Sequence, residues 1–209
     1  MDPGIGPALI DPIAADTRLG PMSRLVYRVL IGLFRRAGWQ AAGTLPPDRK
    51  FVILGASHTS NWDFIVFLGT IEALGRRVRF IGKHSLFAWP IGGFMRAMGG
   101  VPVRRDTRQD LVAQVVAQFA RHDDFALVVA AEGTRARTTR WRTGFYQIAL
   151  QANVPIVCAG PDYARKLGVI GPVIHPTGDY DADMKPAFVF FRGLHPRHPE
   201  RAAFPPGSE

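Results

Sequence analysis

The chain has 209 residues, 47% hydrophobic and 21% charged, a composition typical of a globular protein that argues against global disorder. It contains 26 Lys and Arg against 17 Asp and Glu, and the resulting net charge of +9 attracts phosphate-bearing partners such as nucleic acid, anionic lipid or nucleotide cofactors. The length suits one domain with a well-buried core and argues against two full-sized domains.

Export and membrane spanning are not expected from this sequence. Cys158 is the single cysteine, so no intramolecular disulfide can form. Residues 1–7 lack the basic start and the apolar stretch of a secretory signal. No apolar run approaches the ~20 residues of a spanning helix, because Arg28 interrupts the best candidate and Arg35 and Arg36 end it. We therefore expect a protein on the cytoplasmic side of the membrane, peripheral or monotopic.

The chain begins with a Pro- and Gly-containing arm over residues 1–20, followed by a basic amphipathic helix over 21–39. In this helix a proline start precedes apolar residues at helical spacing and arginines at 24, 28, 35 and 36. Such a helix can lie at a lipid headgroup boundary with its arginines on phosphates, or it can pack on a protein core. Both interpretations stay open here.

The rest of the chain alternates short apolar runs with helical patterns. The runs, each typical of a buried strand, are Phe51–Gly55, Val78–Gly82, Val101–Val103, Phe125–Ala130 and Val154–Cys158. Residues 57–74 have the pattern of a turn followed by a helix, and helical patterns cover 107–121 and 143–152. This alternation predicts a single α/β domain with a central mixed sheet flanked by helices. Beyond Pro161 the pattern weakens, with an edge strand expected at 187–191 and an exposed tail from His195.

The strongest chemical motif is His58 followed by Asp63, directly after the first predicted strand. Ligands usually bind at strand ends in open α/β sheets. Ser60 and Asp63 have the spacing of a helix N-terminal pair, which places Asp63 in the first turn and close to His58. The carboxylate can then fix the tautomer of a general base. The alternative is that Asp63 only caps the helix.

A second motif places arginines at the end of another predicted strand. Arg104 and Arg105 follow the strand after Gly99 and Gly100, and planar guanidinium groups suit phosphate because they bind two oxygens at once. Lys83 follows a neighbouring run and adds positive charge. The alternative is a solvated cluster in which Arg104 pairs with Asp106.

A third motif, Glu132-Gly133-Thr134-Arg135, follows the run that ends at Ala130. Glu132 can hold a substrate hydroxyl or support the arginines, and Arg135 can hold a phosphate. The alternative is a strand-end turn with a local ion pair. Three strand ends bearing His with Asp, Arg with Arg, and Glu with Arg are more specific together than any one alone.

Metal and nucleic-acid sites are not expected. His58, His84, His122 and the later histidines do not match a known zinc spacing. No nucleic-acid motif is present, and the arginines follow predicted strands instead of covering one face.

In order and spacing these motifs resemble the glycerophospholipid acyltransferase family, which includes the lysophosphatidate acyltransferases. The resemblance covers about residues 51–158. The family blocks match His58 to Asp63, Gly99 to Arg105, Glu132 to Arg135, and Val154 to Val157. Ala131 and Ala136 replace a proline and a serine common in the third block, and the sequence after Cys158 diverges.

The resemblance implies an acyl-CoA or acyl-carrier-protein donor, a lysophospholipid acceptor with lysophosphatidate as the first candidate, and no cofactor. His58 and Asp63 would be catalytic, without an acyl-enzyme. Substrate-binding residues would be Lys83, Arg105, Glu132, Gly133, Thr134 and Arg135. Residues 1–39 would form the arm and the helix on an anionic membrane surface, 40–200 the acyltransferase domain, and 201–209 the tail.

Two other functions fit the same residues. A hydrolase would use His58 to activate water against an ester or thioester. A non-catalytic protein would use the basic surface to bind lipid or nucleic acid.

Overall fold

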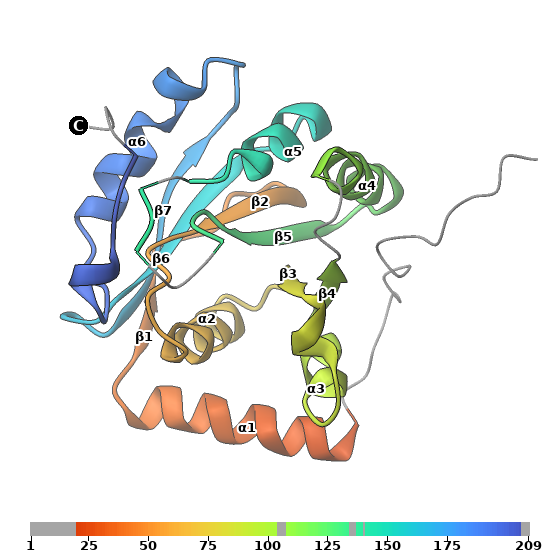
Figure 1. The fold of residues 1–209 in the computed structure, drawn as a ribbon. Coiled ribbons are helices and arrows are strands. Elements are labelled where there is room, and N and C mark those ends of the chain that lie inside the picture. Colours follow the sequence, from red (N-terminus) through yellow and green to blue (C-terminus); the bar gives the residue numbers. More distant parts are fainter. Residues whose placement is uncertain (1–19, 104–107, 134–136, 140, 206–209) are drawn as a thin grey trace, which may run out of the picture.

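The computed structural model describes residues 20–103, 108–133, 137–139 and 141–205 (Figure 1). Its strands are β1 (Gln40–Ala42), β2 (Lys50–Gly55), β3 (Arg79–Lys83), β4 (Gly100–Val103), β5 (Phe125–Ala130), β6 (Ile156–Asp162) and β7 (Leu167–Ile174). The α-helices are α1 (Pro21–Arg36), α2 (Trp62–Ala73), α3 (Gly92–Ala97), α4 (Arg108–Arg121), α5 (Gly144–Ala152) and α6 (Tyr180–Arg192). Two 3₁₀ turns are η1 (His84–Phe87) and η2 (Pro199–Arg201).

The strands form one seven-stranded mixed sheet in the order β1-β7-β6-β2-β5-β3-β4. All neighbouring pairs are parallel except β6 and β7, which are antiparallel. The predicted single α/β domain with a mixed sheet flanked by helices is confirmed. The five predicted strands correspond to β2 to β6, and β2 lies at the centre of the sheet.

Strand β2 is buried on both faces, as expected for a central parallel strand. Its side chains alternate between two cores. Val52 and Leu54 join the core on the side of α4, α5 and α6, whereas Phe51 and Ile53 join the smaller core on the side of α2. All four are at most 2% exposed. This continuous apolar run fixes β2 in the middle of the molecule and presents its carboxyl end at a defined place.

Helix α1 is attached to the sheet through α2 (Figure 1). Ile31 and Phe34 are its buried residues, and the Phe34 ring lies against Gly69 of α2. The Tyr27 hydroxyl donates to Glu72 of α2 at 2.5 Å. Helix α1 therefore packs on the protein core, as one of its two interpretations predicted, but only along the narrow side that carries Ile31 and Phe34. Five of its other apolar side chains are exposed: Met22, Leu25, Val26, Val29 and Leu33.

The expected edge strand at 187–191 is wrong, because these residues belong to helix α6. Asp179 begins the helix by accepting a hydrogen bond from the Ala182 amide at 3.1 Å. Met184, Phe188 and Phe191 recur at helical spacing and are all buried. Helical burial thus outweighs the strand preference of the run Ala-Phe-Val-Phe-Phe.

Gly69→Ala should destabilise the protein, whereas Gly32→Ala should not. A methyl group at Gly69 would overlap the Phe34 ring, and overpacking of this kind costs about 1–3 kcal/mol. Gly32 in α1 has open space around it, so its substitution should stabilise the helix by about 0.5–1 kcal/mol. Urea unfolding of both variants measures the difference. Equal free energies of unfolding would show that α1 does not pack on Gly69.

Candidate active site

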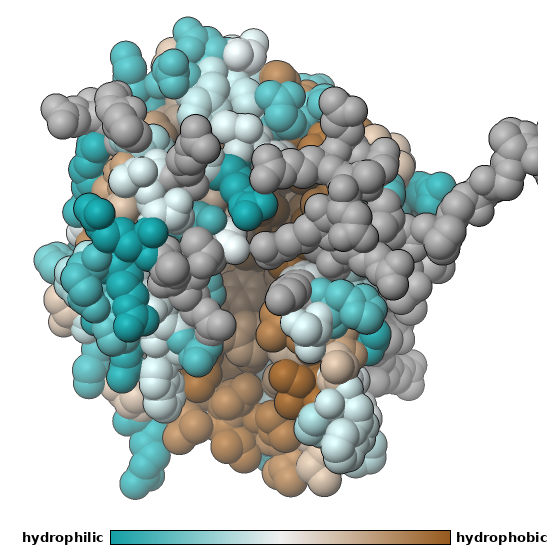
Figure 2. Space-filling view, viewed as in Figure 1, coloured by the Kyte–Doolittle hydropathy of each residue, from teal (hydrophilic) through white to brown (hydrophobic). Residues whose placement is uncertain are grey.

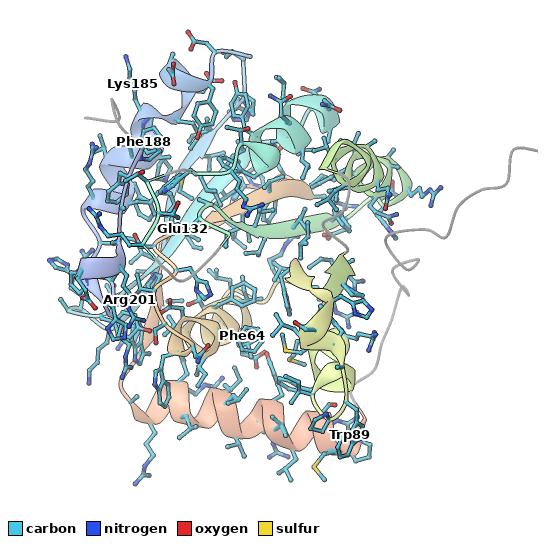
Figure 3. All side chains as sticks on the ribbon, in the orientation of Figure 1. Phe64, Trp89, Glu132, Lys185, Phe188 and Arg201 are labelled. Carbon is cyan, nitrogen blue, oxygen red and sulfur yellow. The ribbon has the colours of Figure 1, made fainter. Side chains whose placement is uncertain are left out.

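The first and third motifs meet where β2 and β5 end. The two strands are parallel neighbours, with Gly55 opposite Ala130. His58 follows β2 and Glu132 follows β5, and the His58 amide donates to Glu132 Oε1 at 3.3 Å. Figure 3 shows Glu132 beside the chain that leads from β2 into α2. Residues 74 positions apart are therefore in contact because parallel strands end at the same edge.

The Asp63 carboxylate organises the loop between β2 and α2. Its Oδ2 atom accepts hydrogen bonds from the amides of Thr59 and Ser60, both at 2.8 Å. The same oxygen lies 3.2 Å from His58 Nδ1. Ser60 Oγ in turn accepts from the Trp62 amide at 3.2 Å. Asp63 thus accepts hydrogen bonds from backbone amides just before α2 and also contacts His58. Helix capping and orientation of the His58 imidazole, the two interpretations of this motif, are therefore compatible.

Tyr163 holds the other oxygen of this carboxylate. It follows β6, the other neighbour of β2, and its hydroxyl donates to Asp63 Oδ1 at 2.6 Å. Burial alone would raise the pKa of Asp63, but the hydrogen bonds from His58, Tyr163 and Ser60 outweigh it and hold the pKa below its usual value. Asp63 is therefore an ionised, buried carboxylate at neutral pH.

This geometry assigns the tautomer of His58. With Nδ1 facing a carboxylate that can only accept, the proton lies on Nδ1 and Nε2 carries the free lone pair. The His58 side chain is 35% exposed while that of Asp63 is 6% exposed. The imidazole is therefore partly open to solvent, and the carboxylate that contacts it is shielded from water.

Glu132 is a buried carboxylate, and one of its two oxygens has no hydrogen-bond donor among the described residues. The residue is 7% exposed, and this oxygen is its Oε2 atom. Burial raises the pKa of Glu132, and the hydrogen bond from His58 offsets only part of that rise. Gly133 has a φ of +63°, and a side chain at this position would overlap the Arg142 side chain. The arrangement leaves one carboxylate oxygen available to a further donor.

The remaining predicted residues are not placed at the site. Arg104, Arg105, Thr134 and Arg135 lie outside the described residues, as does the side chain of Lys83. Lys83 ends β3, which is two strands from β2, and β4 lies at the edge of the sheet. Their predicted substrate-binding roles stay predictions.

Metal-ligand groupings are absent from the described part of the chain, where three or more His, Cys, Asp or Glu side chains never gather closely enough to hold an ion. The expectation that the site uses no metal or cofactor stays a prediction.

Comparison with known proteins identifies the family. A family model described as "Acyltransferase" matches residues 41–160, more than half of the chain. The chain belongs to the acyltransferase family. The matched segment contains His58, Asp63 and Glu132, so the predicted resemblance to glycerophospholipid acyltransferases is confirmed. No curated protein matches the sequence of this acyltransferase.

The fold of this acyltransferase also resembles a solved structure. It matches the 1-acyl-sn-glycerophosphate (LPA) acyltransferase PlsC from Thermotoga maritima with a TM-score of 0.56 and 19% identity, over 82% of this chain and 79% of that one. At this identity the match establishes the common fold.

Several site residues of the acyltransferase lie beyond the matched segment and have no signal in the sequence. Tyr163 is one, and its position after β6 becomes informative only once the sheet order is known. Others lie in the segment after α6. The His198 amide donates to Thr59 Oγ1 at 3.3 Å, and Arg201 Nη1 donates to the Thr59 carbonyl at 3.5 Å.

The expectation of an exposed tail holds for His195, Arg197 and residues 199–201, which are exposed, but it is wrong for residues 202–205. Ala203 is buried, and its carbonyl accepts from Trp141 Nε1 at 3.2 Å. Phe204 packs on the Trp141 ring at 5.8 Å between centroids. Apolar burial and these backbone contacts hold the segment against the domain.

Glu132→Gln should stabilise the acyltransferase at alkaline pH. A carboxyl group with a raised pKa favours folding while it is protonated, and this contribution is lost as the pH rises through that pKa. Gln keeps the neutral form, so we expect a melting temperature about 3 °C higher at pH 8 and a shrinking difference towards pH 4. Thermal melts across this range test it, with exposed Glu200→Gln as control. A difference independent of pH would contradict the assignment.

Proposed function

We propose that this acyltransferase moves a fatty acyl chain from acyl-CoA or acyl-carrier protein to a hydroxyl of a lysophospholipid, with lysophosphatidate as the first candidate, in phospholipid biosynthesis. The observation that carries the proposal is the contact between partly exposed His58 and buried Asp63 at the carboxyl end of β2. The pair has the arrangement of a general base with an orienting carboxylate.

His58 Nε2 takes the proton of the acceptor hydroxyl as its oxygen attacks the thioester carbonyl. Asp63 stabilises the imidazolium that forms, because its carboxylate stays ionised. The tetrahedral intermediate collapses, the carbon–sulfur bond breaks, and the thiolate receives the proton from His58. An ester and a free thiol are the products, and no acyl-enzyme forms.

Glu132 would assist on the acceptor side. Its Oε2 atom has no partner among the described residues and can accept from a second hydroxyl or from a bound arginine. Arg105 and Arg135 would hold the phosphate, as the family resemblance implies.

A hydrophobic hollow near α2 supports a long-chain substrate. Figure 2 shows brown side chains lining this hollow and continuing over the lower face of the molecule, where α1 lies in Figure 1. Phe64 is at this place in Figure 3 and packs edge-on against Phe80 at 5.7 Å between centroids. Aromatic side chains that remain partly exposed here suit contact with an acyl chain.

Helix α1 would dock this acyltransferase on an anionic membrane surface. Its exposed apolar residues share the helix with Arg24, Arg28, Arg35 and Arg36. Trp89 and Ile91, before α3, are 94% and 51% exposed and add to the apolar surface, and Figure 3 shows Trp89 beside α1. Within the described ranges, none of the helices has both the length and the apolar character needed to cross a bilayer. A peripheral position on the cytoplasmic side is the one we propose.

His58→Ala should abolish acyl transfer. Loss of a general base lowers the rate by about 10²–10⁴-fold, whereas the exposed His175→Ala should retain it. Thiol release from long-chain acyl-CoA and acyl-carrier protein is measured with and without lysophosphatidate and other lysolipids. A transferase releases thiol mainly when acceptor is present. Release without acceptor would favour the hydrolase, and equal rates in wild type and His58→Ala would overturn the role of His58.

Val29→Asp should weaken membrane binding. The substitution places a carboxylate on the exposed apolar side of α1, and we expect about tenfold less binding to vesicles containing phosphatidylglycerol. Val189→Asp on α6 is the matched control, because Val189 is also exposed on a helix. Sedimentation with vesicles measures both. Binding equal to wild type in Val29→Asp would contradict docking through α1.

A further inference from the structure

The two oxygens of the Asp63 carboxylate have different partners. Oδ2 accepts from two loop amides and lies against His58 Nδ1, whereas Oδ1 accepts from the Tyr163 hydroxyl at 2.6 Å. The Asp63 side chain is buried, so water has little access to replace that hydroxyl. Because both oxygens belong to one planar group, the hydrogen bond at Oδ1 also fixes the direction in which Oδ2 faces the imidazole.

The backbone of Tyr163 is held on both sides. Its amide donates to the carbonyl of His195, in the segment after α6, at 2.8 Å. The preceding residue, Asp162, is fully buried, and its carboxylate accepts from the Arg165 amide at 3.0 Å and from Arg165 Nε at 2.9 Å. These hydrogen bonds close the turn between β6 and β7. Tyr163 therefore leaves β6 at a fixed position.

The ring of Tyr163 is held as well. Trp39, between α1 and β1, meets it edge-on at 4.8 Å between ring centroids. The Arg197 guanidinium lies 5.9 Å from the centroid of the Tyr163 ring and 5.5 Å from that of the Trp62 ring. Packing of this kind on an aromatic side chain favours one rotamer. The hydroxyl is therefore presented to Asp63 from one direction.

We propose that Tyr163 is a positioning residue for the acyl transfer. Its hydroxyl fixes the Asp63 carboxylate so that Oδ2 keeps the proton of His58 on Nδ1 and leaves Nε2 free to take the proton of the acceptor. The inference rests on the proposed role of His58 as general base. It gives a part in the reaction to a residue beyond the segment that the family model matches.

Tyr163→Phe removes the hydroxyl and keeps the ring. We expect kcat for acyl transfer to fall about tenfold with both KM values unchanged, because the orientation of the imidazole matters when it takes the proton. Tyr146→Phe is the matched control. The Tyr146 hydroxyl also donates to a carboxylate at 2.6 Å, that of Asp183, but this pair lies between α5 and α6 on the other face of the sheet.

The control separates positioning from stability. Tyr146→Phe should lower the melting temperature and retain the wild-type kcat. Equal losses of kcat in Tyr163→Phe and Tyr146→Phe would reduce both hydroxyls to contributions to folding and overturn the proposal. Wild-type kcat in Tyr163→Phe would overturn it as well.

Asp63→Asn shows whether the hydroxyl acts through the carboxylate. In this background Tyr163→Phe should change the rate by less than about twofold, because the carboxylate that the hydroxyl orients is already absent. Single-turnover measurements with excess enzyme reach these slow rates. A tenfold loss that persists in Asp63→Asn would contradict the proposal. If Tyr163→Phe does not fold, Trp39→Leu frees the ring and keeps the hydroxyl, and its expected loss of about threefold should likewise vanish in Asp63→Asn.

Nitrogen NMR of the imidazole reads the same effect without turnover. In wild type we expect the His58 proton on Nδ1, and in Tyr163→Phe a mixture of the two tautomers, with His58→Ala assigning the signals. If the tautomer changes in this way but wild type transfers no acyl chain with any donor, the positioning stands and the proposed transfer fails. If wild type transfers acyl chains and Tyr163→Phe keeps both the tautomer and kcat, the transfer stands and the positioning fails.

Discussion

The active site depends on one buried carboxylate. Asp63 joins the amides of the loop after β2, the imidazole of His58, and the hydroxyl of Tyr163 after β6. These contacts tie the proposed general base, a helix start and a neighbouring strand to a single anion, whose ionised form they also stabilise. A chain that lost this carboxylate would lose the orientation of His58 and the capping of two backbone donors together.

Much of the central architecture could be predicted from the sequence because its signals are local. The apolar run at 125–130 is the strand β5, and the pattern at 143–152 differs from α5 by one residue at its start. The contact between His58 and Asp63 follows from their spacing across a helix start. The contact between His58 and Glu132 could also be predicted, because both residues follow parallel strands of one sheet.

The remaining parts depend on strand order and on long-range packing, which leave no local pattern. Tyr163 reaches Asp63 across 100 positions only because β6 happens to flank β2. Residues 187–191 have strand-like side chains, and only the buried stripe that they complete with Met184 makes them helical. Arg197 and Arg201 lie among prolines and charges that look like a solvated end until Ala203 and Phe204 are seen to pack on Trp141.

The close packing of α1 on Gly69 has a consequence for how a lipid reaches the base. Helices in contact are about 8–10 Å apart, so α2 lies roughly one helix diameter from α1 where the two helices meet at Gly69. With α1 lying in the interface, His58 would sit at the height of the lipid headgroups instead of far out in the water. A lysolipid would then need to rise by only a fraction of a leaflet for its hydroxyl to meet the imidazole, while its chain stayed among its neighbours. The contact between Phe34 and Gly69 would in this way set the distance of the acyl-transfer site from the membrane surface.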